Sequence, residues 1–319
     1  MKLPLVCVGL ALFACSTPSE EAREPQSESE AAEPQEPQEP TTAPEDATLL
    51  TIGAEEIQAH VDVLASDELA GRFSRSEEGH QAAAYVAEAF ERAGLEPAGD
   101  DATWFQAPDD TLSPNVVGRL PGSGTSAIVL TAHYDHLEPR DQGEDRIFNG
   151  ADDNASGTAV VIELAEAFAA RARAGEWPEH TLYFVAFTAE EIGMVGSRHF
   201  VANLPVAKDA VIGNINLDMV SRGEEDLVFC EPGANSQHLR EAAEAANQEL
   251  GELRVRFGAH PEWVGQSDQI SFLREGIPAI YFGVEDHEDY HRVTDHADRI
   301  LPELAARVGR LVERMVGEL

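Results

Sequence analysis

The stretch AIVLTAHYDH, residues 127–136, decides the fold, because an apolar run there ends in a histidine with an aspartate two positions later. A short run of Ile, Val and Leu predicts a buried strand. Two later strings repeat the arrangement, GADDNASG at 150–157 and TLYFVAFTAEE at 181–191. Since polar residues at the carboxyl ends of sheet strands converge at one edge, we interpret the three strings as most of a two-metal hydrolytic site.

Helix-like and strand-like segments alternate from residue 47 onward. Amphipathic spacing predicts the helices, and apolar runs predict the strands. In chain order we predict helices at 53–65, 76–93, 156–173, 195–203, 235–249 and 299–317, and strands at 126–133, 181–187, 210–218, 253–257 and 278–283. This alternation predicts an α/β fold, a three-layer α/β/α sandwich with a central mixed, mainly parallel sheet.

The beginning of the chain predicts an export signal and a tether. Residues 1–15 hold an apolar run that is too short to span a membrane, and the string LFAC at 12–15 resembles the bacterial lipoprotein signal, whose cysteine is lipidated. Ordinary signal cleavage is the alternative. Residues 16–46 are rich in Glu, Pro, Gln and Ser, which predicts a disordered acidic tether. We expect a catalytic domain at 47–319, exported to the cell envelope as a periplasmic or outer-membrane lipoprotein that contacts the membrane by its lipid anchor only.

Charge and cysteine content limit the partners and the compartment. The 59 Asp and Glu outnumber the 22 Lys and Arg, for a formal net charge of -37. Nucleic acids and anionic membranes are also negative, so neither is an expected partner, whereas cations and amines are attracted. Cys230 is the one cysteine outside the predicted signal, so we predict no intramolecular disulfide framework and a buried apolar role for its side chain.

Histidine and aspartate residues near the first strand suggest how a metal is held. His133 ends the strand, and Asp135 points to the same side, so its carboxylate can fix the imidazole tautomer. Asp152 and Asp153 adjoin at a glycine-flanked turn, where two like charges repel unless a cation neutralises at least one of them. These residues therefore favour a metal site over a plain turn.

Later residues complete the predicted ligand set. Glu190 and Glu191 are adjacent in an extended segment and face opposite ways, so one can bind a metal while the other takes a proton from water. Asp218 ends its own strand, and His291 follows the strand at 278–283. Taken singly, each acid or histidine is more often a surface or cap residue, but the ordered set indicates a metal centre.

Residues 53–319 resemble metallopeptidase family twenty-eight, the co-catalytic di-zinc aminopeptidases, which also contains glutaminyl cyclases and glutamate carboxypeptidase relatives. Besides the order of the ligands along the chain, the pairs Gly71-Arg72 and Ser267-Asp268 match the family's pattern. The resemblance implies the phosphorylase/hydrolase-like zinc exopeptidase fold and two Zn²⁺ ions. The roles it implies are His133 and Asp218 on one zinc, Glu191 and His291 on the other, Asp153 bridging both, Glu190 as general base, Asp135 behind His133, and Tyr290 holding the oxyanion.

The activity implied by this resemblance is hydrolysis of the amino-terminal peptide bond. Two zinc ions would activate a water, and Glu190 would carry its proton to the leaving amine. The partners would be peptides or proteins with a free amino terminus, and a monomer is the default expectation. Arg292 and Val293 stand where family members often have threonine and proline, so the pocket there, the preferred first residue and the natural substrates are left open.

Several residues receive an ordinary interpretation. Asp152 is read as a turn former or as a partner behind a ligand, and Asp268 and Asp295 as groups that orient neighbours or form turns or caps. Four histidines are predicted to be ordinary surface or loop residues: His136, His199, His260 and His296.

Four alternatives stay open. HEDYH at 287–291 spells the helical HExxH zinc motif, although the acidic stretch before it has no apolar periodicity. A single-zinc glutaminyl cyclase is disfavoured because both His133 and Asp218 are present. A different two-zinc amidohydrolase family usually has a lysine where Asn154 stands. A non-catalytic lipid-tethered binding module on the same fold is the non-enzyme alternative, and loss of Glu190 or of a ligand would have been its sign.

Overall fold

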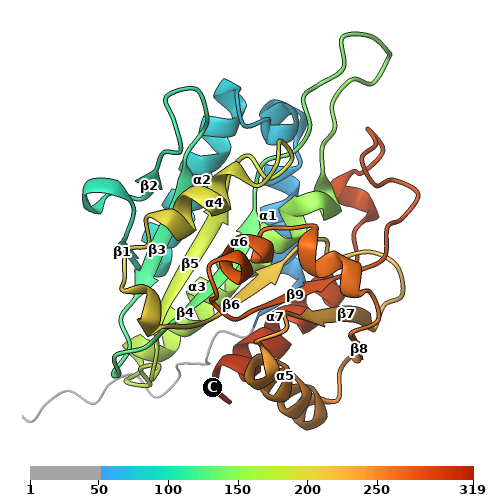
Figure 1. Cartoon of the computed structure of the whole chain (residues 1–319). Helices are drawn as coiled ribbons and strands as arrows, with labels where there is room; N and C mark the ends of the chain where they lie inside the picture. Colours follow the sequence, from blue (N-terminus) through green and yellow to red (C-terminus); the bar gives the residue numbers. More distant parts are fainter. Residues whose placement is uncertain (1–51) are drawn as a thin grey trace, which may run out of the picture. The chain divides into compact units, whose positions relative to one another are not determined.

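One mixed sheet organises residues 52–319, the part of the chain that the computed structural model describes (Figure 1). Within that part the strand order is β1-β3-β5-β4-β6-β9-β7-β8, and β2 pairs with β3 off this path. The strands are β1 Glu96–Pro97, β2 Phe105–Gln106, β3 Asn115–Leu120, β4 Ala127–His133, β5 Thr181–Phe187, β6 Val211–Leu217, β7 Leu227–Pro232, β8 Arg254–Phe257 and β9 Ala279–Gly283.

Four neighbouring strands, β5, β4, β6 and β9, run parallel at the centre of the sheet. β4 pairs with β5 from Ala127 opposite Thr181 to His133 opposite Phe187. β3 and β7 flank this group and are antiparallel to β5 and β9. The carboxyl ends of the four parallel strands therefore lie at one edge, which is where loops of α/β folds form sites.

Helices cover both faces of the sheet. They are α1 Ala54–Leu64, α2 Glu77–Ala93, α3 Gly157–Arg173, α4 Val195–Ala202, α5 Gln237–Leu250, α6 Gln269–Arg274 and α7 Pro302–Val316. α1, α2, α3, α5 and α7 pack in the core of one face, and α4 and α6 pack in the core of the other (Figure 1). The predicted three-layer α/β/α sandwich is thus confirmed.

Alternate residues of β4 enter the two cores. Ile128 and Leu130 belong to the larger core, whereas Val129 packs in the smaller core with Phe200 of α4 and Phe272 of α6. A strand covered on both faces reads as a continuous apolar run, because both of its sides are buried. This packing is why the run before His133 predicted a central strand.

Local signals placed the predicted helices and strands close to their observed bounds. α2 begins after Ser76, whose Oγ accepts the Gly79 amide at 3.1 Å, and ends at Gly94 in the left-handed conformation. Asn154 Oδ1 accepts the amide of Gly157, the first residue of α3, at 3.0 Å. β1, β2, β3, β7 and α6 were not predicted. β3 and β7 gain their hydrogen bonds from β5 and β9, which are distant in sequence, so local patterns do not reveal them.

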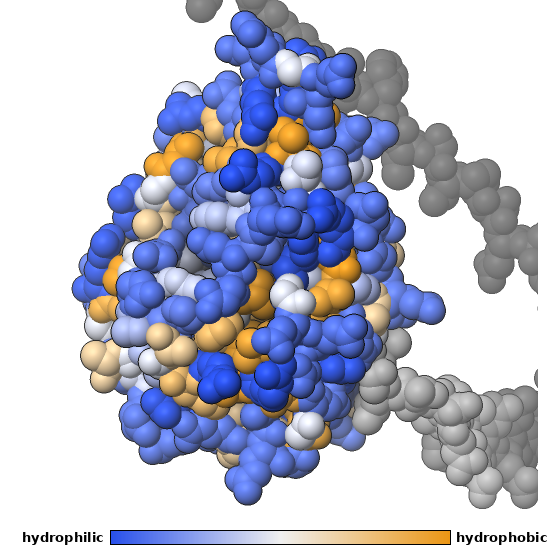
Figure 2. Space-filling model, turned by 90° about the vertical axis from the view of Figure 1, so that its right-hand side faces the viewer, coloured by the Kyte–Doolittle hydropathy of each residue, from blue (hydrophilic) through white to orange (hydrophobic). Residues whose placement is uncertain are grey.

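The predicted signal at 1–15 and tether at 16–46 lie outside the described residues. Among residues 52–319, no helix is both long and apolar enough to cross a membrane. The face in Figure 2 is mainly hydrophilic, with its hydrophobic residues in small patches, in keeping with the strongly charged composition. Cys230 is fully buried, as predicted, and burial raises the pKa of its thiol well above the usual value.

Candidate metal centre

The parallel strands bring the predicted ligands to one edge of the sheet. His133 is the last residue of β4, and Asp218 directly follows β6. Glu190 and Glu191 come from the loop after β5, Asp153 from the turn before α3, and His291 from the loop after β9. A cavity at this edge is lined by all six of them, together with Met219, Trp263, Gln266, Ser267, Tyr281, Val284, Asp286 and Tyr290.

His133, Asp153 and Asp218 form the first half of the centre. His133 Nε2 lies 3.3 Å from Asp218 Oδ1 and 3.5 Å from Asp153 Oδ1. Ligands held at about 2.0–2.2 Å around a tetrahedral zinc are separated by about 3.3 Å. The three atoms therefore have the spacing of ligands on one ion.

His291, Asp153 and Glu191 form the second half. His291 Nε2 lies 3.1 Å from Asp153 Oδ2 and 3.3 Å from Glu191 Oε2. Asp153 thus offers Oδ1 to the first group and Oδ2 to the second, which is how one carboxylate bridges two ions. The geometry brings together all five predicted ligands in the predicted grouping.

The charge of the centre fits divalent cations. Asp153 and Asp218 are buried beside Glu190 and Glu191, and burial together with Glu191 raises the pKa of Asp153. Although burial opposes it, hydrogen bonds from His136 and His291 hold the pKa of Glu191 below its usual range. Charged carboxylates buried at this density repel one another unless they are neutralised, and imidazole with carboxylate oxygen is a donor set that suits zinc. The residues present therefore fit two such ions.

Glu190 lies in the same cavity but belongs to neither ligand group. Its backbone amide donates to Asp135 Oδ1 at 3.0 Å, which fixes the start of the Glu190–Glu191 pair. Burial raises the pKa of Glu190 well above its usual value, and the neighbouring Asp268, Asp218 and Glu191 add to this effect. A carboxylate that binds protons readily and coordinates no metal suits a general base.

Asp135 lies beside His133, as expected, but its main-chain oxygen makes the closer contact and its carboxylate does not. His133 Nδ1 is 3.1 Å from the main-chain oxygen of Asp135 and 3.8 Å from its carboxylate. A backbone carbonyl can fix an imidazole tautomer as a carboxylate does. The carboxylate is therefore free to hold the Glu190 amide.

Three further acids lie behind the ligands. Asp152 Oδ1 accepts from the Ser221 amide and hydroxyl, both at 2.7 Å, so Asp152 ties loops together. Asp295 accepts from the amides of Asp152 and Asp153, at 3.0 and 3.1 Å from Oδ2, and so orients the bridging residue. Asp268 is fully buried, and within residues 52–319 its two carboxylate oxygens have no hydrogen-bond partner.

The side chain of Arg72 connects the loops that carry the ligands. Its fully buried guanidinium donates to the main-chain oxygens of Tyr134 at 2.6 Å, Asn149 at 2.6 Å and Gly150 at 2.9 Å. Burial lowers the pKa of Arg72 to about 10, while Asp135 and Asp153 oppose this. Gly71 has a positive φ of 78°, and a Cβ there would lie 2.5 Å from the Phe148 carbonyl oxygen. The Gly71-Arg72 pair therefore has a structural role that the sequence did not indicate.

The interpretation of His136 as an ordinary loop residue is wrong. Its side chain is fully buried, and Nδ1 lies 2.6 Å from Glu191 Oε1 and 3.8 Å from Asp153 Oδ2. In the sequence, His136 directly follows His133 and Asp135, and no neighbouring residue marks it as having a role of its own. The other three histidines, His199, His260 and His296, are at least partly exposed, as expected.

The HEDYH string at 287–291 is not helical, so it cannot present two histidines on one face of a helix. His287 Nε2 points instead to Asp152 Oδ2 at 3.2 Å, whereas His291 enters the cavity. Tyr290 lines the cavity and stacks on His291, with ring centroids 4.0 Å apart. The helical HExxH alternative is therefore not supported.

Sequence reasoning did not single out Trp263, Gln266, Tyr281 and Asp286, which also line the cavity. Trp263 stacks on His260 with ring centroids 4.0 Å apart, and His260 Nε2 lies 2.9 Å from Glu285 Oε1. Tyr281 donates its hydroxyl to the main-chain oxygen of Asp218 at 3.0 Å. Only the tertiary fold brings these residues to the ligands, so no local motif marks them.

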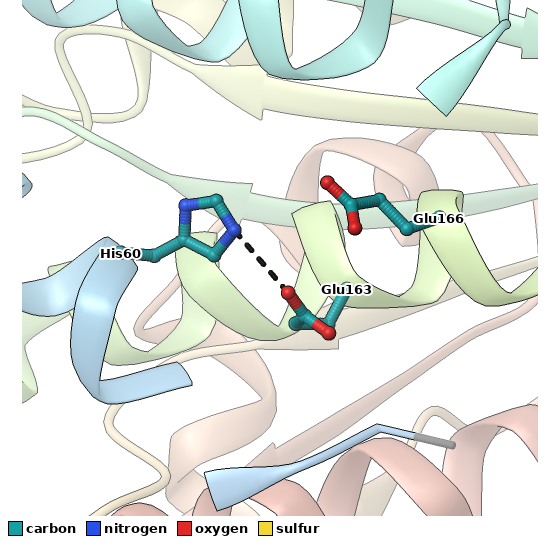
Figure 3. Close-up of side chains that lie close together, drawn as sticks. All are labelled: His60, Glu163 and Glu166. Atoms are coloured by element: carbon teal, nitrogen blue, oxygen red, sulfur yellow. Dashed lines mark ion pairs between the residues drawn. The ribbon is translucent and has the colours of Figure 1, made fainter. Parts of the chain in front are cut away.

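A second histidine–carboxylate group lies between α1 and α3 (Figure 3). His60 Nε2 is 3.2 Å from Glu163 Oε1, and Nδ1 is 2.7 Å from the Tyr85 hydroxyl. Glu166 lies one turn further along α3, and burial with the nearby Glu163 raises its pKa. His60 Nε2 thus meets one carboxylate and Nδ1 one hydroxyl, and these contacts link α1 to α3 and α2.

Comparison with known proteins places this geometry in a family. The model of peptidase family M28 matches residues 115–316. The aminopeptidase YwaD of Bacillus subtilis is 30% identical over 205 residues, which cover 60% of this chain and 40% of that protein. The chain thus spans about two fifths of the length of this curated relative.

Solved structures share the fold. BSAP, a zinc aminopeptidase from Bacillus subtilis, aligns with a TM-score of 0.68 at 18% identity, over 84% of this chain and 95% of that one. A glutaminyl cyclase from Bacteroides thetaiotaomicron aligns with a TM-score of 0.65 at 19% identity, over 84% and 99%. These likenesses show the fold alone, whereas the family match extends through the cavity residues from His133 to His291. The chain belongs to peptidase family M28.

Proposed function

We propose that this protein is a zinc-dependent aminopeptidase whose centre holds two zinc ions. One observation carries the proposal: the carboxylate of Asp153 places one oxygen within 3.5 Å of His133 and the other within 3.1 Å of His291. A bridging carboxylate between two such groups is the arrangement of a two-metal hydrolytic site.

Different residues of the chain carry out different steps of the hydrolysis. When bound, the zinc ions supply Lewis acidity, which polarises a carbonyl and lowers the pKa of water. Glu190 takes a proton from the attacking water and passes it to the leaving amine, so one water is added across the peptide bond. Tyr290, beside His291 at the cavity wall, donates its hydroxyl to the oxyanion that forms on the carbonyl oxygen.

The acidic cavity favours substrates with a free amino terminus. Once ions neutralise the ligand carboxylates, Asp286 still lines the cavity as an acid outside the ligand groups, and no lysine or arginine is among the lining residues. An ammonium group is therefore attracted, which suits removal of the first residue of a peptide or protein. The name of the relative YwaD as an aminopeptidase and that of BSAP as a zinc aminopeptidase support this assignment.

Two alternatives are less well supported. A single-zinc glutaminyl cyclase shares the fold, but His133 and Asp218 both have ligand spacing here, which favours a second ion. A non-catalytic binding module would not need Glu190, which is present in the cavity. We also propose that the chain is an exported, lipid-anchored envelope protein, because LFAC at 12–15 and the acidic stretch after it are typical of such proteins.

Zinc content and a pair of peptides test the proposal. We expect about two zinc ions per chain by mass spectrometry after purification without chelators. A peptide with a free amino terminus should lose its first residue, whereas the same peptide with an acetylated amino terminus should be stable. No bound zinc, even after zinc is offered, would refute the hydrolase. One zinc, with cyclisation of an amino-terminal glutamine, would favour the cyclase.

A further inference from the structure

His136 lies close enough to Asp153 and Glu191 to share an ion with them, but its contact with Glu191 is shorter than the spacing of two ligands. Its Nδ1 lies 2.6 Å from Glu191 Oε1, whereas His291 Nε2 lies 3.3 Å from Glu191 Oε2. Two donors on one tetrahedral zinc are separated by about 3.3 Å, so 2.6 Å is too short for a shared ion and fits a charge-assisted hydrogen bond. The two oxygens of Glu191 therefore have different partners.

The surroundings of His136 hold its ring in this orientation. The ring is fully buried and meets Phe148 edge-on, with centroids 6.4 Å apart. A Cβ on Gly150 would lie 2.6 Å from the His136 ring, so the ring packs directly against the backbone there. Nε2 is buried and has no hydrogen-bond partner within residues 52–319, which leaves Nδ1 as the nitrogen that donates.

We propose that His136 is a positioning residue for the second zinc: it donates Nδ1–H to Glu191 Oε1 and thereby aims Oε2 at the ion. Asp135 holds the Glu190 amide and His136 holds the Glu191 carboxylate, so consecutive residues after β4 fix consecutive residues after β5. A ligand carboxylate that is fixed in this way loses less freedom when it binds metal. This inference rests on the proposed two-zinc function.

A matched pair of amide variants tests the hydrogen bond. The amide nitrogen of asparagine takes the place of Nδ1, whereas that of glutamine takes the place of Nε2. In a chelator competition titration, we expect His136→Asn to bind the second zinc within a few fold of the wild type. His136→Gln should bind it roughly 10- to 100-fold more weakly, while the first zinc is unchanged in both.

Two further variants serve as the positive and the negative control. Glu191→Gln removes a proposed ligand and shows the signal expected when the second zinc is lost. His296→Asn removes an exposed histidine and should leave both zinc affinities unchanged. Circular dichroism without zinc checks that each variant is folded.

The outcomes separate this inference from the proposed function. If the wild type binds two zinc ions and His136→Gln binds both as tightly, the role of His136 is refuted while the two-zinc function stands. Equal weakening in the Asn and Gln variants would also refute it, because ring packing would then matter and not the hydrogen bond. If the wild type binds no zinc, both proposals fail together.

Discussion

The cluster at the strand ends and the cluster between α1 and α3 contain the same kinds of side chain, but their atoms are satisfied differently. In the helix cluster, His60 Nε2 faces one carboxylate, that of Glu163, and Nδ1 meets the Tyr85 hydroxyl. In the edge cluster, His133 Nε2 faces two carboxylates, those of Asp153 and Asp218, and Nδ1 meets the main-chain oxygen of Asp135. One imidazole can balance one carboxylate, whereas several carboxylates around one ring need cations. Composition alone therefore does not identify a metal site.

The origin of each cluster explains the difference. Where α1 packs against α2 and α3, His60 meets one side chain from each neighbouring helix. The carboxyl ends of the parallel strands β5, β4, β6 and β9 instead lie side by side at one edge of the sheet, so residues from four strand ends share one space. The predictions below test this contrast.

The largest effect is expected for Glu190→Gln. The amide keeps the size of the side chain but cannot accept a proton, so kcat should fall by about 10²- to 10⁴-fold. Zinc content should not change, because Glu190 is in neither ligand group. Mass spectrometry and peptide assays on one preparation check both points. A variant that loses a zinc would place Glu190 among the ligands.

Arg72→Met should destabilise the fold by about 3–5 kcal/mol, since it leaves buried carbonyl oxygens without donors and removes a charge beneath the edge cluster. Urea denaturation measures the loss. Arg119→Met is the control, because Arg119 pairs with Glu96 at the surface and should contribute less than about 1 kcal/mol. Equal losses in the two variants would mean that Arg72 does not support the ligand loops.

Removal of metal should destabilise the protein more at high pH than at low pH. Burial raises the pKa of Asp135 to about 6 and that of Asp268 to about 7. Folded values above the unfolded ones mean that protonation stabilises the fold, so this contribution is complete below about pH 4 and lost as pH rises through about 7. Chelation should therefore lower Tm more at about pH 8 than at about pH 5. Equal shifts at the two pH values would contradict this linkage.

The sequence predicted the edge cluster well because its residues follow strands with strong apolar signals. His133 ends one such run and Glu190 follows another, and both lie within the residues that the family model matches. The contributions of His136, Arg72 and Trp263 depend on contacts that only the packed fold creates, such as the 2.6 Å contact between His136 and Glu191. β3 and β7 were missed for the same reason, since their hydrogen-bond partners are distant in sequence.

The smallest effect is expected in the helix cluster. His60→Gln should leave the zinc content unchanged and cost roughly 1 kcal/mol of stability, the usual contribution of one hydrogen-bonded pair. A double-mutant cycle with Glu163→Gln should give a coupling energy of similar size, since the two side chains contact each other at 3.2 Å. If His60→Gln instead removed a bound zinc, the helix cluster would be a metal site too. The number of carboxylates that face each imidazole would then fail to distinguish the two clusters, because a ring that faces a single carboxylate would also bind a cation.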